Sequence, residues 1–378
     1  MAEIEIGIGK SGRRGFSLDE VAVVPSRRTR DADEVDISWQ IDAYQFELPV
    51  IASANDGVTS PATAIEMSRL GGAGTLHIEG LWCRYEDPTP YLEEIAAAGK
   101  EMPVARLREI YSQPISPDLI GERVAQIRDA GATVCVAVSP ARTESLLEHI
   151  TRSEPDLLVI QGTITSAEHV SDGAHEPLDL KYLIRRLEVP VLVGGCASYQ
   201  AGLHLMRTGA AGVLVGVGPD TSSTTSRVLG IGNPLATAIA DVRAARMRHL
   251  DETGVYVHVI ADGSMNTGGD IAKAVVCGAD GIMLASPLAR AEEAPGGGAI
   301  WSMTSFHNTL PRGRVSKLDT VGTLETILNG PSDRSDGRTN LMGGLRKSMA
   351  LAGHNTLKDF QKADLTVTAP PAVRPGVQ

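Results

Sequence analysis

The chain has 378 residues, a formal net charge of −11 and 42% hydrophobic residues, enough apolar side chains for one large domain or two ordinary ones. The acidic balance disfavours a general nucleic-acid binder, because such proteins gather Lys and Arg on one face. Its four cysteines are widely spaced, without CxxC or CxxH pairs, so we expect neither a metal centre nor a disulfide scaffold. No apolar run approaches the length of a membrane span, and we expect no membrane partner and a cytoplasmic location.

Eight short apolar runs alternate with helical patterns along the chain. Each run is continuously aliphatic or β-branched, as expected of strands that are buried on both faces. Eight such units predict a TIM (β/α)8 barrel, with an open doubly wound sheet as the alternative. The eight runs are residues 48–53, 73–77, 133–138, 156–161, 189–195, 211–217, 255–261 and 281–286.

The same junction recurs three times between a helical pattern and the strand that follows it. It reads IRDAGATVCVAV, LMRTGAAGVLVGV and VVCGADGIMLAS. Glycine can take the left-handed conformation that ends a helix, so each junction predicts a helix that stops at its Gly.

Two segments and the tail fall outside the repeat. Residues 79–117 contain four prolines (Pro88, Pro90, Pro103 and Pro114) and predict a long excursion with one helix. Residues 292–340 are rich in Gly, Pro and charge, and they form a long irregular insertion after the last barrel strand, where lids and binding loops occur. We expect a single domain over residues 1–362 and a disordered tail over 363–378.

Candidate site residues are those that directly follow each strand, because barrel enzymes place function on these loops. The loops after the last three strands combine Gly with hydroxyl residues and lead into helices, which favours an anion site. The first of them, GVGPDTSSTTSRVLGIG, spans residues 216–232. Asp262 ends the seventh strand and is placed either to bind a sugar diol or to cap the next helix.

Several long segments resemble the IMP dehydrogenase/GMP reductase family. The segment ADGSMNTGGDIAKAVVCGADGIMLASPLARAEEAPG is similar to the family's nucleotide-binding segment, and GVGPDTSSTTSRVLGIGNP to its catalytic loop. Further similar segments extend the resemblance from Phe16 to Phe360. The length leaves no room for a regulatory CBS module, so the chain most resembles the short bacterial IMP-dehydrogenase-related proteins that lack it.

The resemblance implies an oxidoreductase that uses NAD or NADP and acts on a purine nucleotide such as IMP, XMP or GMP. It also implies a homo-oligomer, a tetramer in this family. Carried onto this sequence, the substrate phosphate and ribose contacts are Ser53, Asn55, Gly218, Thr221, Asp262, Gly263, Ser264 and Ser286. The catalytic positions are Ser223, Thr225 and Glu293, the last two as a pair that handles protons, and the cofactor positions are Gln161, Gly162 and Cys196.

This sequence departs from the family pattern where the chemistry takes place. Ser223 stands where the family has a nucleophilic cysteine, and a serine hydroxyl needs an adjacent base that a thiol does not. Asp220 replaces a glycine whose carbonyl serves a monovalent cation in the dehydrogenases, so the cation stays open. Gln161 replaces a cofactor-binding aspartate, and Cys196 replaces an asparagine. The base-recognition segment, a tyrosine followed by RGMGS, is not recognisable between residues 301 and 317.

These departures leave three hypotheses open. The first is hydride chemistry on a purine nucleotide without the usual thiol adduct. The second is a catalytically silent barrel that binds a purine nucleotide and acts as a regulator, and the third is a barrel for a different phosphorylated substrate. Arg312 or Arg314 could replace the dehydrogenase's water-activating arginine, or both could be solvated. His307 could contact the ligand or be a lid residue. Glu293 could cap a helix instead of moving protons.

Overall fold

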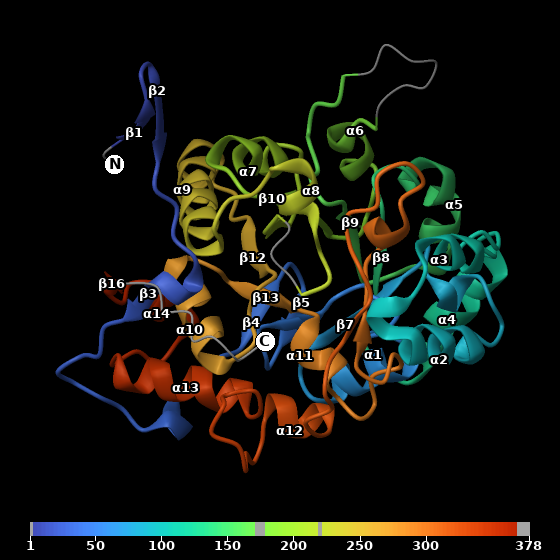
Figure 1. Cartoon of the computed structure of the whole chain (residues 1–378). Helices are drawn as coiled ribbons and strands as arrows, with labels where there is room; N and C mark the ends of the chain where they lie inside the picture. Colours follow the sequence, from blue (N-terminus) through green and yellow to red (C-terminus); the bar gives the residue numbers. More distant parts are fainter. Residues whose placement is uncertain (1–2, 171–177, 218–220, 369–378) are drawn as a thin grey trace.

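The computed structural model describes residues 3–170, 178–217 and 221–368, and its centre is a closed barrel of eight parallel strands (Figure 1). Neighbouring strands follow chain order around the barrel, and the last pairs with the first. The TIM barrel expected from the sequence is therefore confirmed, and the open sheet is excluded. The barrel strands are β6 (Val50–Ala52), β7 (Ala73–His77), β8 (Cys135–Val138), β9 (Leu157–Gln161), β10 (Val191–Cys196), β11 (Gly212–Val215), β12 (His258–Asp262) and β13 (Gly281–Leu284).

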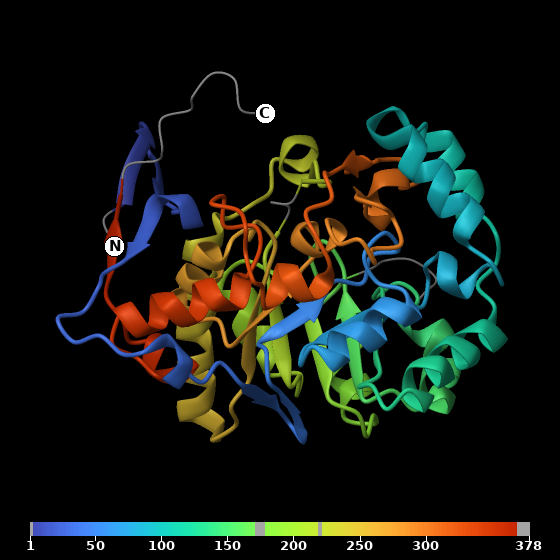
Figure 2. The same cartoon turned by 90° about the horizontal axis from the view of Figure 1, so that it is seen from below.

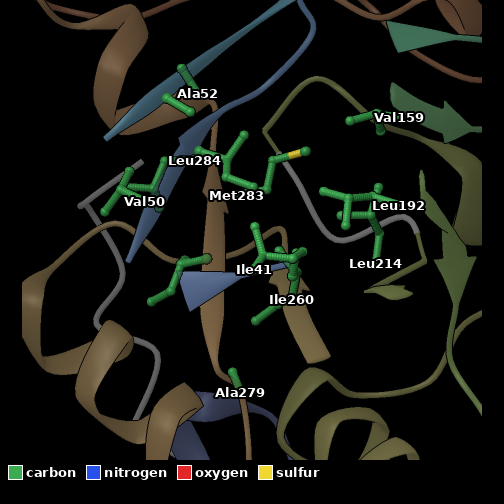
Figure 3. Packing of buried hydrophobic residues seen from close by; sticks show 14 of the residues in the cluster. Ile41, Val50, Ala52, Val159, Leu192, Leu214, Ile260, Ala279, Met283 and Leu284 are labelled. Atoms are coloured by element: carbon green, nitrogen blue, oxygen red, sulfur yellow. The ribbon is translucent and has the colours of Figure 1, made fainter. Parts of the chain in front are cut away.

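The barrel interior is filled by the aliphatic side chains of these strands. Figure 3 shows Val50, Leu192, Ile260 and Met283 converging from different strands. All four side chains are at most 1% exposed. Both faces of each strand are covered, by this interior on one side and helices on the other, which explains the continuous apolar runs in the sequence.

One helix returns the chain between successive strands and packs on the outside of the barrel. The three junction glycines Gly131, Gly209 and Gly278 have φ angles of 73°, 97° and 127°, a region that favours glycine, so they end their helices as the sequence predicts. The covering helices are α1 (Pro61–Arg69), α4 (Pro117–Asp129), α5 (Thr143–Ser153), α6 (Leu180–Ile184), α7 (Tyr199–Met206), α9 (Leu235–Thr253), α10 (Gly268–Cys277) and α13 (Leu341–Leu351).

The N-terminal end of the barrel is closed by a hairpin, β4 (Trp39–Ile41) with β5 (Tyr44–Phe46), which lies beneath the strands in Figure 2. Near it, the carboxylate of Asp280 is 4% exposed and accepts hydrogen bonds from Arg246 at 2.6 Å and Lys358 at 2.7 Å. Lys358 belongs to α14 (Leu357–Phe360), so this cluster ties the last helix and α9 to the barrel.

The excursion between β7 and α4 differs from the expectation of one helix. It contains two, α2 (Thr89–Ala98) and α3 (Val104–Ile110), separated by a short 3-10 turn. Pro103 precedes the first residue of α3 and Pro88 precedes α2, positions at which a proline does not interrupt a helix. The prolines that suggested an irregular segment instead mark where helices begin.

The insertion after β13 folds back over the carboxyl ends of the barrel strands. It begins with α11 (Ser286–Ala289) and forms a small antiparallel pair, β14 (Ala299–Ile300) with β15 (Ser316–Lys317), before α12 (Leu324–Leu328). Its apolar side chains share a second hydrophobic cluster with α2 and α3, separate from the barrel core. We call residues 81–111 and 299–315 the lid subdomain; Figure 2 shows its two segments side by side.

The expected tail boundary at residue 363 falls inside ordered structure. Residues Leu365–Val367 form β16, which pairs antiparallel with β3 (Val21–Val23). A hairpin of β1 (Glu3–Gly7) and β2 (Lys10–Arg13) projects beside them (Figure 1). Between β11 and α9, residues 221–231 form the loop that contains α8 (Thr225–Leu229). In the described ranges, no helix has the length and hydropathy needed to cross a membrane.

Candidate functional site

A cavity of about 790 Å³ opens at the carboxyl ends of the barrel strands, the size of a small-molecule site. The cavity is lined by residues at the ends of seven of the eight barrel strands or in the loops after them, and by the lid subdomain. The side chains expected to bind ligand therefore come from distant parts of the chain. Of the site residues predicted from the sequence, those that line it are Ser53, Asn55, Gln161, Gly162, Thr221, Ser223, Thr225, Asp262, Gly263, Ser264 and Ser286.

The two hydroxyls that the sequence predicts to bind phosphate lie together. Ser286 Oγ donates to Thr221 Oγ1 at 3.2 Å, although the two residues lie 65 positions apart. Ser316 Oγ from β15 donates to the Thr221 carbonyl at 3.0 Å and fixes the start of the loop. Gly218 and Asp220, also assigned to this part of the site, lie outside the described residues.

Asp262 lies at the end of β12 and faces the cavity. Its Oδ2 accepts a hydrogen bond from Gln161 Nε2 at 2.8 Å. The alternative role as a helix cap is wrong: the N-cap of α10 is Thr267, whose side chain accepts from the Asp270 backbone N–H. A carboxylate at this place, oriented by an amide, is suited to accept hydrogen bonds from a diol.

The lid subdomain contacts the loop that contains Ser223 through backbone hydrogen bonds. Ser223 forms a bridge with Gly313, the Thr224 N–H donates to the Arg312 carbonyl at 3.0 Å, and the Arg314 N–H donates to the Ser222 carbonyl at 2.8 Å. Ser223 Oγ itself donates to Thr225 Oγ1 at 3.1 Å. The insertion therefore holds the loop that carries the family's nucleophile position.

Two assigned residues do not reach the cavity in the described structure, and these assignments are corrected. The Glu293 carboxylate accepts from the Leu324 N–H at 2.9 Å at the first turn of α12, whose N-cap is Thr323, and Glu293 is not among the described residues that line the cavity with Thr225. Cys196 is 1% exposed behind its strand, and burial raises the pKa of its thiol to about 12. The four-residue α11 turns the chain away from the cavity before Glu293.

The cavity also contains residues that the sequence analysis did not select. Asp56, His77, Tyr111 and Trp301 line it, and the first three are each at most 9% exposed. Tyr111 Oη donates to Asp56 Oδ2 at 2.5 Å, and Trp301 Nε1 donates to Tyr111 Oη at 2.8 Å. Asp56 lies in the loop after β6 and His77 is the last residue of β7, so both are at strand ends, and this position was a signal that could have identified them.

The candidate cationic residues of the insertion have different environments in the structure. Arg312 and His307 line the cavity, whereas Arg314 is exposed. Arg312 Nε is buried without a hydrogen-bond partner in the described structure. Arg312 is also the one arginine among the described lining residues, next to the Ser223 bridge, so it can stabilise negative charge there.

The electrostatics of the site differ from those of a metal centre. No group of three or more His, Cys, Asp or Glu side chains that could hold a metal ion occurs in the described part of the chain. Burial raises the pKa of Asp56, and the nearby His77 opposes this shift. Hydroxyls and amides dominate the remaining lining, which suits ligands with many hydrogen-bonding groups.

Comparison with known proteins agrees with this architecture. The IMP dehydrogenase / GMP reductase domain matches residues 15–323. An uncharacterized oxidoreductase of Mycolicibacterium smegmatis is 50% identical over 96% of this chain and 99% of its own length. The inosine-5'-monophosphate dehydrogenase of Thermoplasma acidophilum is 26% identical over 92% of this chain and 90% of its own length.

A solved structure shows the same fold over nearly the whole chain. The crystal structure of an IMP dehydrogenase/GMP reductase-like protein from Corynebacterium glutamicum superposes with a TM-score of 0.92 at 46% identity, covering 97% of this chain and 98% of that one. The chain belongs to the IMP dehydrogenase/GMP reductase family of oxidoreductases.

Proposed function

We propose that this protein is an oxidoreductase that acts on a purine nucleotide with NAD or NADP. The observation that carries the proposal is the convergence of Asp262 with the Thr221–Ser286 hydroxyl pair in one cavity at the carboxyl end of the barrel. A carboxylate for the ribose diol beside hydroxyl donors for the phosphate is the arrangement a nucleotide requires. We also propose a homo-oligomer, a tetramer, in the cytoplasm.

The residues that line the cavity have different proposed roles. Asp262 binds the ribose, and Gln161 holds its carboxylate in place. Gln161 and Gly162 line the same cavity and would contact the nicotinamide end of the cofactor, which supplies or accepts hydride when bound. Arg312 would stabilise negative charge at the base.

We propose no covalent adduct at Ser223. Its hydroxyl donates to Thr225 Oγ1 at 3.1 Å. A serine hydroxyl is much less acidic than a thiol, so at neutral pH it is a poorer nucleophile than the family's partly ionised cysteine. Ser223 would then line the site and form hydrogen bonds there without reacting.

A second function is favoured by one specific observation. The Glu293 carboxylate accepts from the Leu324 N–H at the first turn of α12, and Glu293 does not line the cavity with Thr225 in the described structure. This favours a catalytically silent barrel that binds a purine nucleotide. The two functions share the binding site and differ in turnover.

The test follows nicotinamide absorbance with IMP, XMP and GMP, each with NAD and NADP and in both redox directions. We expect turnover with one nucleotide and its loss in Asp262→Ala, with the exposed Asp333→Ala as the matched control. Nucleotide binding without turnover would replace the enzyme by the silent binder. Absence of both would contradict the purine-nucleotide proposal.

A further inference from the structure

Three segments that are far apart in the sequence meet at one buried hydroxyl. Tyr111 ends the excursion after β7, Asp56 follows β6, and Trp301 belongs to the late insertion. Their exposed fractions are 7%, 4% and 2%, so the contacts among them are shielded from water. The Tyr111 hydroxyl donates to Asp56 Oδ2 at 2.5 Å and accepts from Trp301 Nε1 at 2.8 Å. It therefore joins the barrel to both parts of the lid subdomain.

The partners of this hydroxyl are themselves held in place. Asp56 Oδ2 also accepts from the Leu81 N–H at 3.0 Å, and the Phe306 ring stacks on Tyr111 at 4.1 Å between centroids. The Trp301 carbonyl accepts from the Asn55 amide. Burial and the Asp56 carboxylate raise the pKa of Tyr111 well above its ordinary value, so the phenol keeps its proton and remains a donor.

From Trp301 the chain leads directly to the Ser223 loop. After a 3-10 turn over Met303–Phe306, the Arg312 N–H donates to the Thr304 carbonyl at 2.7 Å. The next residues form the bridge to the loop, through the Thr224 and Arg314 amides. A Cβ at Gly313 would lie 2.5 Å from Ser305 Oγ and 3.1 Å from the Ser222 carbonyl, so glycine permits this close approach.

We propose that Tyr111 is a positioning residue for the Ser223 loop, acting through Trp301 and the segment from Ser302 to Arg314. A two-residue bridge has little stability by itself, because short isolated pairs of strands are marginal in water. The bridge therefore depends on how firmly the 301–314 segment is held, and the Tyr111 hydroxyl is one of the contacts that fix that segment, beside the Asn55 amide on the Trp301 carbonyl. This inference concerns the protein without ligand and does not rest on the proposed substrate.

The test is amide hydrogen exchange of the full chain, read by mass spectrometry, in Tyr111→Phe. This variant keeps the ring that stacks on Phe306 and loses both hydrogen bonds. We expect exchange of the Thr224 and Arg314 amides to become about tenfold faster or more, while the β8 and β9 amides are unchanged. Tyr85→Phe is the matched control: Tyr85 lies in the same subdomain and donates to the Ile110 carbonyl at 2.8 Å.

Unchanged exchange at Thr224 and Arg314 in Tyr111→Phe would overturn the proposal, and so would an equal acceleration in Tyr85→Phe, since that would mean general loosening of the lid subdomain. Trp301→Phe removes the other half of the same connection and should accelerate the same two amides. If Tyr111→Phe does not fold, this second variant decides the matter on the same readout. Because no nucleotide is added, failure here leaves the proposed function untouched, and failure of the proposed function leaves this result untouched.

Discussion

Ser223 shows how one atom changes the chemistry available to a conserved-looking site. The loop around it keeps Thr221 in place against Ser286, and Asp262 keeps its position at the end of β12. A hydroxyl at residue 223 offers a hydrogen-bond donor where the family offers a thiol. In the proposed function, binding and covalent catalysis are separable, because they are assigned to different residues.

The reactivity of the thiols provides a prediction at this scale. All four cysteines are buried, and burial raises the pKa of each thiol to about 12. We therefore expect no reaction of the folded protein with an aromatic disulfide reagent, and reaction of all four thiols once the chain is unfolded. Ser223→Cys should add one thiol that reacts in the folded state, because Ser223 is partly exposed in the cavity. Rapid labelling of the unmodified folded protein would contradict the burial described for these residues.

Individual site residues could be predicted from the sequence when they directly follow a barrel strand. Asp262 was selected in this way, because the strand ends of a barrel face one common cavity, whereas Thr221 was assigned from the family resemblance; both line the cavity. Tyr111 and Trp301 could not be, since their contact joins residues 190 positions apart through two insertions whose packing no periodic pattern describes. For Glu293 the sequence left proton transfer and a helix cap open, and the structure shows its carboxylate bound to the Leu324 N–H at the first turn of α12.

Among the elements, the two insertions depend on each other. Neither has a core of its own, and the small cluster of Leu92, Ile95, Leu107, Trp301 and Phe306 forms where they meet. The proline-rich excursion was expected to contain one helix, and it forms two, whose apolar residues pack against the late insertion. Tertiary packing therefore decided the structure of a segment whose local signals favoured loops.

At the opposite end of the barrel, the Asp280 cluster holds elements together by charge. Arg246 and Asp280 are 2% and 3% exposed at their side chains, so removal of one leaves the other buried and unpaired. We expect Asp280→Ala to lower the free energy of unfolding by about 3–5 kcal/mol in urea titrations. The matched control is Glu148→Ala, which removes an ion pair with Arg152 whose side chains are 76% and 71% exposed. An equal loss in both variants would contradict the role assigned to burial.

For the whole molecule, the barrel was the part that the sequence predicted best. All eight strands fall within the apolar runs or within one residue of them, and the junction glycines have the positive φ angles expected. Continuous burial on both faces leaves a strong sequence signal, and repetition of the same unit fixes the topology. The ordered β16 was not anticipated, because its residues are exposed and carry no such signal.

The stability of the whole fold should depend on pH through His258. Burial lowers the pKa of this residue from 6.5 to about 4, with Lys358 and Arg246 acting in the same direction and Asp280 opposing them. Between these pH values the unfolded chain binds a proton that the folded chain does not, so stability falls as the pH drops from about 6.5 to about 4. The loss should total roughly 3 kcal/mol, measured as unfolding free energy against pH.

His258→Phe is the matched variant for this prediction. It keeps an aromatic ring against Trp39 and Tyr256 and removes the titrating group. The variant should show a flatter dependence of stability on pH over the same range, and an unchanged slope would exclude His258 as its source. This variant should still lose stability as the pH falls from about 3.8 to about 2. That loss comes from Asp280, whose pKa is lowered from 3.8 to about 2 in the folded protein.

The central claim is that this barrel binds the ribose and phosphate of a purine nucleotide with Asp262 on the diol. Calorimetric titration of a purine ribonucleotide and its 2′-deoxy analogue into the unmodified protein and Asp262→Ala tests it most directly. We expect the unmodified protein to prefer the ribonucleotide by about tenfold or more, and Asp262→Ala to abolish this preference, because the hydrogen bonds to the diol are lost. A ribose preference that survives Asp262→Ala, or no binding of any purine nucleotide, would contradict the account.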